Sequence, residues 1–546
     1  MRSPRPSLVV TGEIVVAAEP DRLETAEAVG ISDGAVVMTG AAHELLEAAA
    51  PRARVIEAGP VAVVPGIHDF HLHLVGMARA RRTVDLEDAR SMDEILARVT
   101  SAAELLPPGT WVRGDGWHAE VLVPSELGRL EASLRGRPAL LKSHDRHSAW
   151  ASPAALERAG VADDAGDPLG GRFERDGGGR LNGLLRESAA DLVSDHAERL
   201  VGEPLVAALR EVAGQLVELG ITAVTDAGDP TTSNGHGTYA PLGDSFANLT
   251  AAEDVFVGRV RVNLNLPADA VDDAAQLGLR TGQPLSDARW FRVGWAKQFA
   301  DGALGSRTAA LFEPYSCTEV SDERGIPRIE AEGLDDLLRR SGDAGIGLAI
   351  HAIGDRAVST VLDAIGRAPS RREELPPHRI EHAQLVRAAD RPRFAALGVT
   401  ASLQPIHLPS DRHVAEQCWA GRLDDAYAYR SMAREGALLA FGSDAPIESA
   451  NPWCGILAAV RRTVPGDEAP PWALAEAMTP EAALSAYTLG PARAAGRSDV
   501  GHLRPGARAD LAVLDVDLAT LLAADERLAT ARSRLTLVDG REVRGV

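Results

Sequence analysis

The chain has 546 residues, of which 45% are hydrophobic and 25% charged, and its formal net charge is −21. These values are those of an ordinary globular protein, and the length allows two to four domains or one large barrel with additions. The negative charge argues against nucleic acid or a membrane surface as a partner, so we expect a small-molecule partner and leave a homodimer open. No apolar run reaches the ~18 residues of a membrane span, and no signal-peptide core opens the chain, which predicts a cytoplasmic location.

The two ends of the chain have the same texture. Residues 1–64 and 496–546 carry short valine-rich runs that are broken by glycine and Asp-Gly, as in β-hairpins. Neither end offers enough strands for a stable sheet of its own. We therefore predict one small β domain that is built from both termini.

The region between the termini, residues 65–495, has a different rhythm. Short apolar strands alternate with amphipathic stretches, which is typical of βα units and an α/β fold. Eight such strands can be counted, at residues 61–70, 220–228, 258–266, 289–299, 345–355, 378–386, 398–405 and 436–446. Eight parallel strands predict a closed (β/α)8, TIM-like barrel, whose functional residues lie at the C-terminal strand ends.

One connection is too long for a single crossover. From about residue 80 to 219 the chain contains helical pieces and a glycine-rich turn. Such a length is unusual for a simple loop, so we predict an inserted lid subdomain over the mouth of the barrel. A lid in that position would shape the binding pocket.

The three cysteines, Cys317, Cys418 and Cys454, have no CxxC spacing. Their odd number and their spacing favour neither a disulfide framework nor a thiolate zinc site. We expect free thiols in the core or near the surface.

Two histidines, His71 and His73, close the first predicted strand. Residues two apart in a strand face the same side, so both imidazoles can bind one metal ion. The alternative is a pair of polar residues that merely cap the strand. Asp69 lies on the same face and could orient a ligand or bind the metal weakly, whereas His68 faces away and is expected to be a packing or surface residue.

Polar residues also end later strands. Lys297 lies in an apolar strand, where burial would lower the pKa of its amine and allow it to form a carbamate, unless it simply pairs with Asp301. His351 and His382 close consecutive strands and suit a metal site, although a buried histidine is often only a core residue. Asp444 ends the eighth strand as a further ligand and proton shuttle, or as the N-cap of the next helix.

These residues, in this order, resemble the amidohydrolase superfamily, specifically the amidohydrolase 3 branch of YtcJ-like proteins and N-substituted formamide deformylases. The similarity spans nearly the whole chain. It is carried by PGIHDFHLHL, GRLNGLLRES, FADGALGSRTAAL, AIHAIGDRAV, RIEHAQLV, SLQP, FGSDAP, NPWCGILAAVRR and GHLRPGARADLAVLDVD. Local departures are His118, Arg146 and Ser152, at positions where relatives usually carry an acidic residue, glycine and asparagine.

The resemblance implies a metal-dependent hydrolase that acts on a non-peptide C–N bond through metal-activated hydroxide. It implies one divalent ion, expected to be zinc, on His71, His73 and Asp444, and a second on His351 and His382, with Lys297 as a carboxylated bridge. One ion or two could be bound. Asp444 and Lys297 are the expected catalytic residues, and the candidates for binding substrate are Asp145, His147, Glu187, Arg307 and Gln404.

Two other interpretations of the sequence stay open. The same site could deaminate a heterocycle, or the fold could serve as a metal-free scaffold without catalysis. The expected products distinguish amide hydrolysis from deamination, because amide hydrolysis releases an amine and an acid, whereas deamination releases ammonia. Metal analysis separates both from the scaffold.

Overall fold

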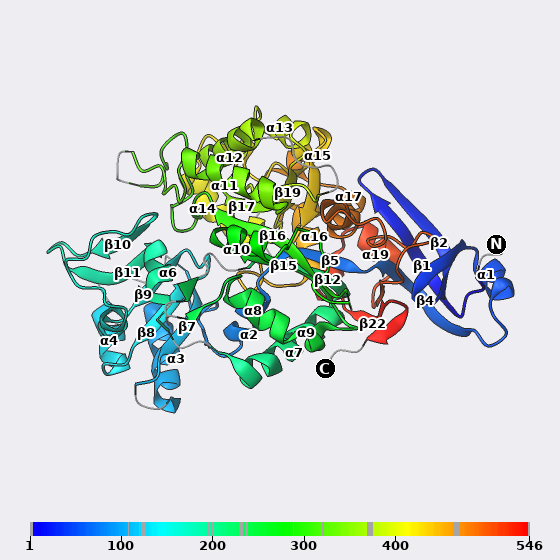
Figure 1. Ribbon diagram of the computed structural model, residues 1–546, viewed down its shortest axis with the longest axis horizontal. Coiled ribbons are helices and arrows are strands. Elements are labelled where there is room, and N and C mark those ends of the chain that lie inside the picture. The colour runs from blue at the N-terminus through cyan, green and yellow to red at the C-terminus, as the bar shows by residue number, and fades with distance from the viewer. Residues whose placement is uncertain are drawn as a thin grey trace.

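The computed structural model describes residues 4–106, 109–118, 121, 127–194, 196–197, 200–228, 233–234, 238–287, 289–318, 322–368, 375–463 and 470–543. Three large sheets organise this part of the chain. In Figure 1 a barrel with its helices occupies the centre, a sheet formed by the two ends of the chain lies on one side, and an inserted sheet lies on the other.

The central sheet is a nearly closed barrel of eight parallel strands, which confirms the predicted fold class. The neighbours follow chain order apart from the seam between the first and last strands. The strands are β5 (Ile67–Leu72), β12 (Ile221–Asp226), β15 (Arg261–Pro267), β16 (Phe291–Phe299), β17 (Leu348–Ala352), β18 (Arg379–His382), β19 (Thr400–Leu403) and β20 (Leu438–Phe441).

Helices cover the outside of the barrel (Figure 1). They include α2 (Leu74–Ala80), α7 (Gly202–Glu218), α8 (Asp244–Ala251), α10 (Val271–Gln276), α11 (Ala331–Ala344), α12 (Asp355–Arg367), α13 (Arg391–Ala396), α14 (His407–Cys418), α15 (Tyr429–Arg434), α16 (Pro452–Arg461), α17 (Pro480–Tyr487) and α18 (Leu489–Ala494). No helix in the described ranges is both long and apolar enough to cross a lipid bilayer.

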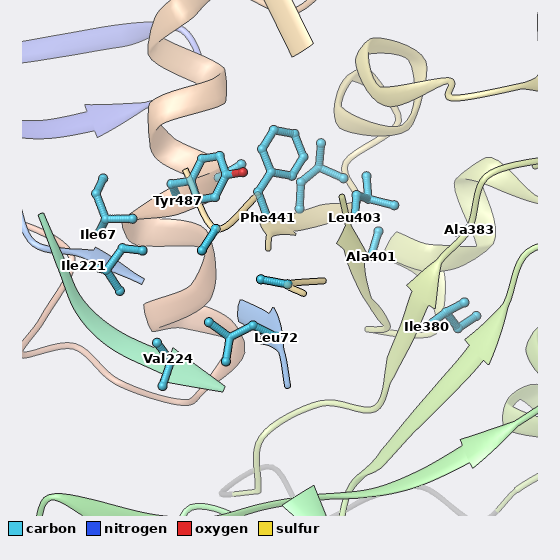
Figure 2. Packing of buried hydrophobic residues seen from close by; sticks show 14 of the residues in the cluster. Ile67, Leu72, Ile221, Val224, Ile380, Ala383, Ala401, Leu403, Phe441 and Tyr487 are labelled. Atoms are coloured by element: carbon cyan, nitrogen blue, oxygen red, sulfur yellow. The ribbon is translucent and has the colours of Figure 1, made fainter. Parts of the chain in front are cut away.

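The core lies between the outer face of the barrel and this layer of helices. Figure 2 shows part of it, where Leu72, Val224, Leu403 and Phe441 come from four barrel strands and Tyr487 comes from α17. The rings of Phe441 and Tyr487 meet edge to face, with centroids 5.5 Å apart. Strands of a parallel barrel are covered on both faces, which explains why β5, β17, β18 and β19 are buried at every position.

The first predicted strand, residues 61–70, is divided in the structure. Its first half ends β4 (Arg54–Pro65) in the terminal sheet, and its second half begins β5 in the barrel. Gly66 separates the two, and a Cβ atom there would lie 2.1 Å from Oγ1 of Thr222. A continuous apolar run conceals this division because both sheets bury the same kinds of side chain.

Both termini contribute to one sheet of seven strands, which confirms the predicted β domain. Its order is β23-β22-β21-β4-β1-β2-β3, and β21 pairs with β4 to join the two ends of the chain. The other strands are β1 (Leu8–Glu19), β2 (Arg22–Ser32), β3 (Ala35–Gly40), β21 (Leu511–Leu514), β22 (Ser533–Val538) and β23 (Arg541–Val543).

The inserted region forms a six-stranded sheet with order β10-β11-β9-β8-β7-β6. Its strands are β6 (Val84–Asp85), β7 (Val112–Trp117), β8 (Ala139–Ser143), β9 (Ser148–Ala151), β10 (Gly171–Arg175) and β11 (Leu181–Glu187), and its helices are α3 (Met92–Leu105), α4 (Leu127–Leu134), α5 (Pro153–Arg158) and α6 (Ser188–Ser194). Helix α7, which falls within the predicted range 80–219, instead packs in the barrel core.

The expectation of free thiols is wrong for two of the three cysteines. Cys317 and Cys418 form a disulfide across 101 residues of sequence, whereas Cys454 is free. Cys317 lies in the segment after β16 and Cys418 ends α14, so the fold brings together two positions that the sequence separates. Spacing rules for short motifs carry no information about such a distant pair.

The seam of the barrel is closed by loop atoms. The amide of Asp444 donates to the carbonyl oxygen of His71 at 2.7 Å, and the amide of Ser443 donates to Oδ1 of Asp69 at 3.0 Å. The amide of His73 donates to the carbonyl oxygen of Ala445 at 2.8 Å. These bonds hold the end of β5 against the end of β20.

This seam predicts the effect of Gly442→Ala. A Cβ atom at Gly442 would lie 2.4 Å from the backbone nitrogen of His71, so the two strand ends must separate. We expect the free energy of unfolding to fall by about 1–3 kcal/mol, as for other overpacked sites. Urea unfolding measures the change, and Gly342→Ala in α11, where nothing lies within 4 Å of the added atom, is the control. Equal stability of the Gly442→Ala variant and the wild type would contradict this account of the seam.

Candidate metal centre

Three of the predicted ligands converge at the C-terminal ends of the barrel strands. His71 comes from β5, His382 ends β18 and Asp444 follows β20, and their ligand atoms all lie within 4.8 Å of one another. All three side chains are buried. His382 therefore lies with His71 and Asp444, whereas the resemblance implies that His382 binds a different ion from those two residues.

The backbone is unusual at two of these positions. His382 has φ +71° and Asp444 has φ +60°, both in the left-handed region that non-glycine residues seldom adopt. At these residues the chain departs from the alternation of a regular strand. Strain of this kind persists where the surrounding structure enforces it, and it concentrates at functional sites.

Buried charges fix the orientation of His71. Its Nδ1 forms a close hydrogen bond with Glu381, and the carboxylate of Glu381 is in turn held by Arg379. The guanidinium of Arg379 lies 4.0 Å from the ring centroid of Phe70 and donates to the Phe70 carbonyl oxygen. A carboxylate on Nδ1 leaves Nε2 as the free electron-pair donor, which is the arrangement that second-sphere carboxylates impose on metal-binding histidines.

Asp444 is surrounded by imidazoles. Its Oδ1 lies 3.1 Å from Nε2 of His73 and 3.4 Å from Nε2 of His71, and its Oδ2 lies 3.3 Å from Nε2 of His407. Burial alone would raise the pKa of Asp444, but the adjacent imidazoles of His407, His71 and His73 hold it well below its usual range. The carboxyl group is therefore ionised. The alternative role as an N-cap is wrong, because Asn451 caps the next helix, α16.

His351 and Lys297 lie beside this group. The ring centroid of His351 is 4.5 Å from that of His382, and its Nε2 lies 3.0 Å from the carbonyl oxygen of Gly302. Lys297 is 1% exposed, and its Nζ lies 4.7 Å from the ring centroid of Phe299. Burial lowers the pKa of Lys297 to about 8, although Glu381 and Asp444 oppose the shift.

The alternative pairing of Lys297 with Asp301 does not occur. Asp301 accepts hydrogen bonds from the amides of Ala310, Ile353 and Gly354, and no ion pair joins it to Lys297 in the described part of the chain. The carboxylate instead ties the segment after β16 to the end of β17.

The histidines of the site fall into two electrostatic groups. Burial lowers the pKa of His73, His351 and His382, so these imidazoles are neutral and suited to bind metal. For His147 and His407 burial is outweighed by neighbouring carboxylates, which raise the pKa to about 9 and about 10. Those two are protonated at neutral pH and can donate hydrogen bonds.

The donor set fits a divalent metal ion. Nε2 of His71 and Nδ1 of His382 are buried, and neither has a hydrogen-bond partner among the described residues. A buried polar atom without a partner is costly, and such atoms mark places where an ion or water belongs. Imidazole nitrogens and an ionised carboxylate are ligands that zinc takes in proteins.

The predicted substrate-binding residues are distributed unevenly. Nδ1 of His147 lies 2.9 Å from Glu187, and its ring centroid lies 5.1 Å from that of His351, so this pair borders the centre. Asp145 accepts from Ser143 and from the amide of His147, which shapes the loop. Gln404 is buried, and its Oε1 has no partner among the described residues. Arg307 is half-buried with φ +57°, and no described contact links its side chain to the metal ligands.

The two remaining residues around the HxH pair have structural contacts. Nε2 of His68 lies 3.0 Å from Oγ1 of Thr225, which makes His68 a packing residue as expected. Asp69 accepts hydrogen bonds from the amides of His71 and Ser443, so it orients the backbone around His71.

Sequence reasoning missed four residues of the site: Arg379, Glu381, His407 and Glu448. Glu381 precedes His382 and shares a strand face with Arg379, so two buried charges at alternate positions are a usable signal. His407 begins α14, three residues after Gln404, and contacts Asp444 only through the tertiary fold. Glu448 gives no comparable signal, because its partners His144 and His407 are distant in sequence.

Fold and site together define a class: a parallel (β/α)8 barrel with a cluster of histidines and one aspartate at its C-terminal mouth. The sequence of the chain matches the model of the amidohydrolase family over residues 54–544. The protein therefore belongs to the amidohydrolase family.

Individual relatives agree. YtcJ of Bacillus subtilis is 31% identical over 90% of this chain and 91% of its own length. N-substituted formamide deformylase of Arthrobacter pascens is 30% identical over 91% of this chain and 92% of its own. The crystal structure of an uncharacterized metal-dependent hydrolase from Pyrococcus horikoshii OT3 superposes with a TM-score of 0.69 at 26% identity, covering 92% of this chain and 96% of that one. Family and relatives support a hydrolase.

The Arg379–Glu381 pair predicts how Glu381→Gln changes stability. Both side chains are fully buried, so the variant leaves the guanidinium uncompensated and lowers the free energy of unfolding of metal-free protein by about 3–5 kcal/mol at neutral pH. Burial alone would raise the pKa of Glu381, but Arg379 and His71 hold it well below its ordinary 4.5. The stability that ionisation of Glu381 contributes is thus complete above about pH 4.5 and is lost as the pH falls further.

The measurement is urea unfolding of both proteins across this pH range. The difference between wild type and Glu381→Gln should be constant above about pH 4.5 and should shrink below it. The exposed Glu435→Gln serves as the control. A difference that is absent at neutral pH, or that grows on acidification, would contradict the assignment.

Proposed function

We propose that this protein is a metal-dependent hydrolase that cleaves a non-peptide, amide-type C–N bond of a small molecule. The observation that carries the proposal is the convergence of His71, His382 and Asp444, in which one nitrogen of each histidine has no hydrogen-bond partner in the described part of the chain. The N-substituted formamide deformylase relative, whose name describes a reaction at such a bond, supports the bond class.

The residues that would hold the metal are His71, His73, Asp444, His351 and His382, and zinc is the ion that this donor set favours. A divalent ion bound there would polarise the substrate carbonyl group and lower the pKa of water towards neutrality. One or two ions fit the proposal. The close grouping of His71, His382 and Asp444 favours His382 as a ligand of the same ion as His71.

Asp444 is the proposed proton shuttle. Its carboxylate is ionised and therefore ready to accept a proton from attacking water and deliver it to the leaving nitrogen. His407, protonated and 3.3 Å away, holds Oδ2 and leaves Oδ1 directed to His71 and His73.

His147 is the proposed donor to the substrate carbonyl oxygen. Nδ1 faces Glu187, which is also held by Arg328 at 3.2 Å, and the carboxylates of Glu187 and Asp145 keep the imidazole protonated although burial and Arg328 oppose them. A fixed cationic donor stabilises the negative charge that develops on a carbonyl oxygen during hydrolysis. Oε1 of Gln404, which no described residue contacts by a hydrogen bond, can accept from a substrate N–H group.

Lys297 is the proposed carboxylated bridge. Lysine occurs in this chain only at positions 142 and 297, while arginine supplies the other basic side chains. A guanidinium keeps its proton at any accessible pH, whereas a buried amine loses it more readily and can react with carbon dioxide. The use of lysine at this buried position therefore suits amine chemistry.

Turnover of N-formyl and N-acyl amines tests the bond class. We expect one amine and one acid per turnover, and a decrease of about 10²–10⁴-fold in kcat for Asp444→Asn, as for loss of a general acid–base group. The exposed Asp343→Asn in α11 is the control. Ammonia released from heterocyclic substrates, with no amine from any amide, would favour the deaminase alternative, and full activity of Asp444→Asn would refute the shuttle.

Metal removal tests the cofactor. Dialysis against a chelator should abolish activity, and added zinc should restore it in proportion to the metal bound. Lys297→Ala should lower the bound metal and the turnover together, whereas Lys142→Ala, which replaces the other lysine, should change neither. Protein that contains no metal after growth with added zinc or manganese would instead favour the metal-free scaffold.

A further inference from the structure

A second group of metal-binding side chains lies outside the barrel, in the inserted sheet. Strands β6, β7 and β8 of that sheet are parallel neighbours. Glu87 follows β6, His118 follows β7 and His144 follows β8. The C-terminal ends of parallel neighbours meet at one edge, so three donor side chains from distant parts of the sequence are brought together, as in the barrel.

Their donor atoms have the spacing of a chelating site. Oε1 of Glu87 lies 3.2 Å from Nε2 of His118 and 2.8 Å from Nδ1 of His144, and the three ligand atoms all lie within 4.8 Å of one another. The two imidazole rings stack, with centroids 4.8 Å apart and planes inclined by 22°. Two imidazole nitrogens and a carboxylate form one of the ligand sets that zinc takes in proteins.

A fourth residue comes from the barrel. Nε2 of His144 lies 3.4 Å from Oε1 of Glu448, in the loop after β20. A carboxylate on one imidazole nitrogen orients the ring and leaves the other nitrogen for a metal ion.

The group is accessible from solvent. Glu87, His144 and Glu448 line a cleft of 520 Å³ between the inserted sheet and the barrel loop. The side chains of Glu87, His118 and His144 are 44%, 29% and 15% exposed. The nearby cation Arg146 faces Asp115, with Nη2 3.5 Å from Oδ2, and so leaves Glu87 to the two histidines.

We propose that Glu87, His118 and His144 form a second metal site that binds a divalent ion of the zinc type, with Glu448 as its outer carboxylate. Glu448 lies in the same loop as Asp444, and it is also 3.8 Å from Nδ1 of His407. The ion therefore ties the inserted sheet to the loop that carries Asp444. This site shares no ligand with the barrel centre and does not depend on the proposed reaction.

Zinc content at equilibrium tests the proposal. Chelator-treated protein is dialysed against buffered free zinc, and bound metal is measured by atomic emission. Wild type should hold one zinc ion per chain more than His118→Asn/His144→Asn, while the control His43→Asn/His413→Asn, which replaces two exposed histidines, should match wild type. Glu87→Gln, which keeps both imidazoles, should lower the affinity of this second site for zinc by at least about tenfold.

The barrel centre can be removed from the measurement. The variant His71→Asn/His73→Asn should keep the zinc ion of the second site, and it should lose that ion when His118→Asn and His144→Asn are added. Equal zinc content in wild type and in a folded His118→Asn/His144→Asn variant, together with unchanged affinity in Glu87→Gln, would overturn the proposal and leave the cluster as an imidazolium held by two carboxylates.

Discussion

Closure of the barrel is the constraint on which the site depends. When the sheet curls until its last strand reaches its first, the amide of Asp444 meets the carbonyl oxygen of His71 at 2.7 Å, although the two residues are 373 positions apart in the sequence. Asp69 reinforces the contact by accepting from the amide of Ser443. The carboxylate of Asp444 is thereby placed among imidazoles from three other segments of the chain, and no single segment could assemble this arrangement locally.

Burial and neighbouring charges then decide the protonation state of each imidazole. Within one site the imidazoles of His351 and His382 are kept neutral by desolvation, whereas those of His147 and His407 are kept protonated by adjacent carboxylates. Neutral imidazoles that suit a metal ion and protonated imidazoles that can donate hydrogen bonds therefore arise from the same side-chain type in different surroundings. Glu381 and Arg379 perform a related task beneath the site, because their buried pair sets the tautomer of His71.

Much of the fold was predictable because the eight barrel strands are short apolar runs with polar residues at their ends. The terminal β domain was predictable for a similar reason, since both ends carry the same broken valine-rich pattern. The break at Gly66 was not, because β4 and β5 bury equally apolar side chains. The Cys317–Cys418 bond, the contact of His407 with Asp444 and the edge formed by Glu87, His118 and His144 depend on tertiary proximity, which periodicity cannot encode.

The central claim is that His71, His382 and Asp444 bind a common metal ion. Crystals of zinc-loaded protein, measured on both sides of the zinc absorption edge, test it most directly, because an anomalous difference map locates zinc independently of the protein atoms. The account predicts a peak at the barrel mouth within bonding distance of all three side chains. A map from fully loaded crystals with no peak at that position would contradict it.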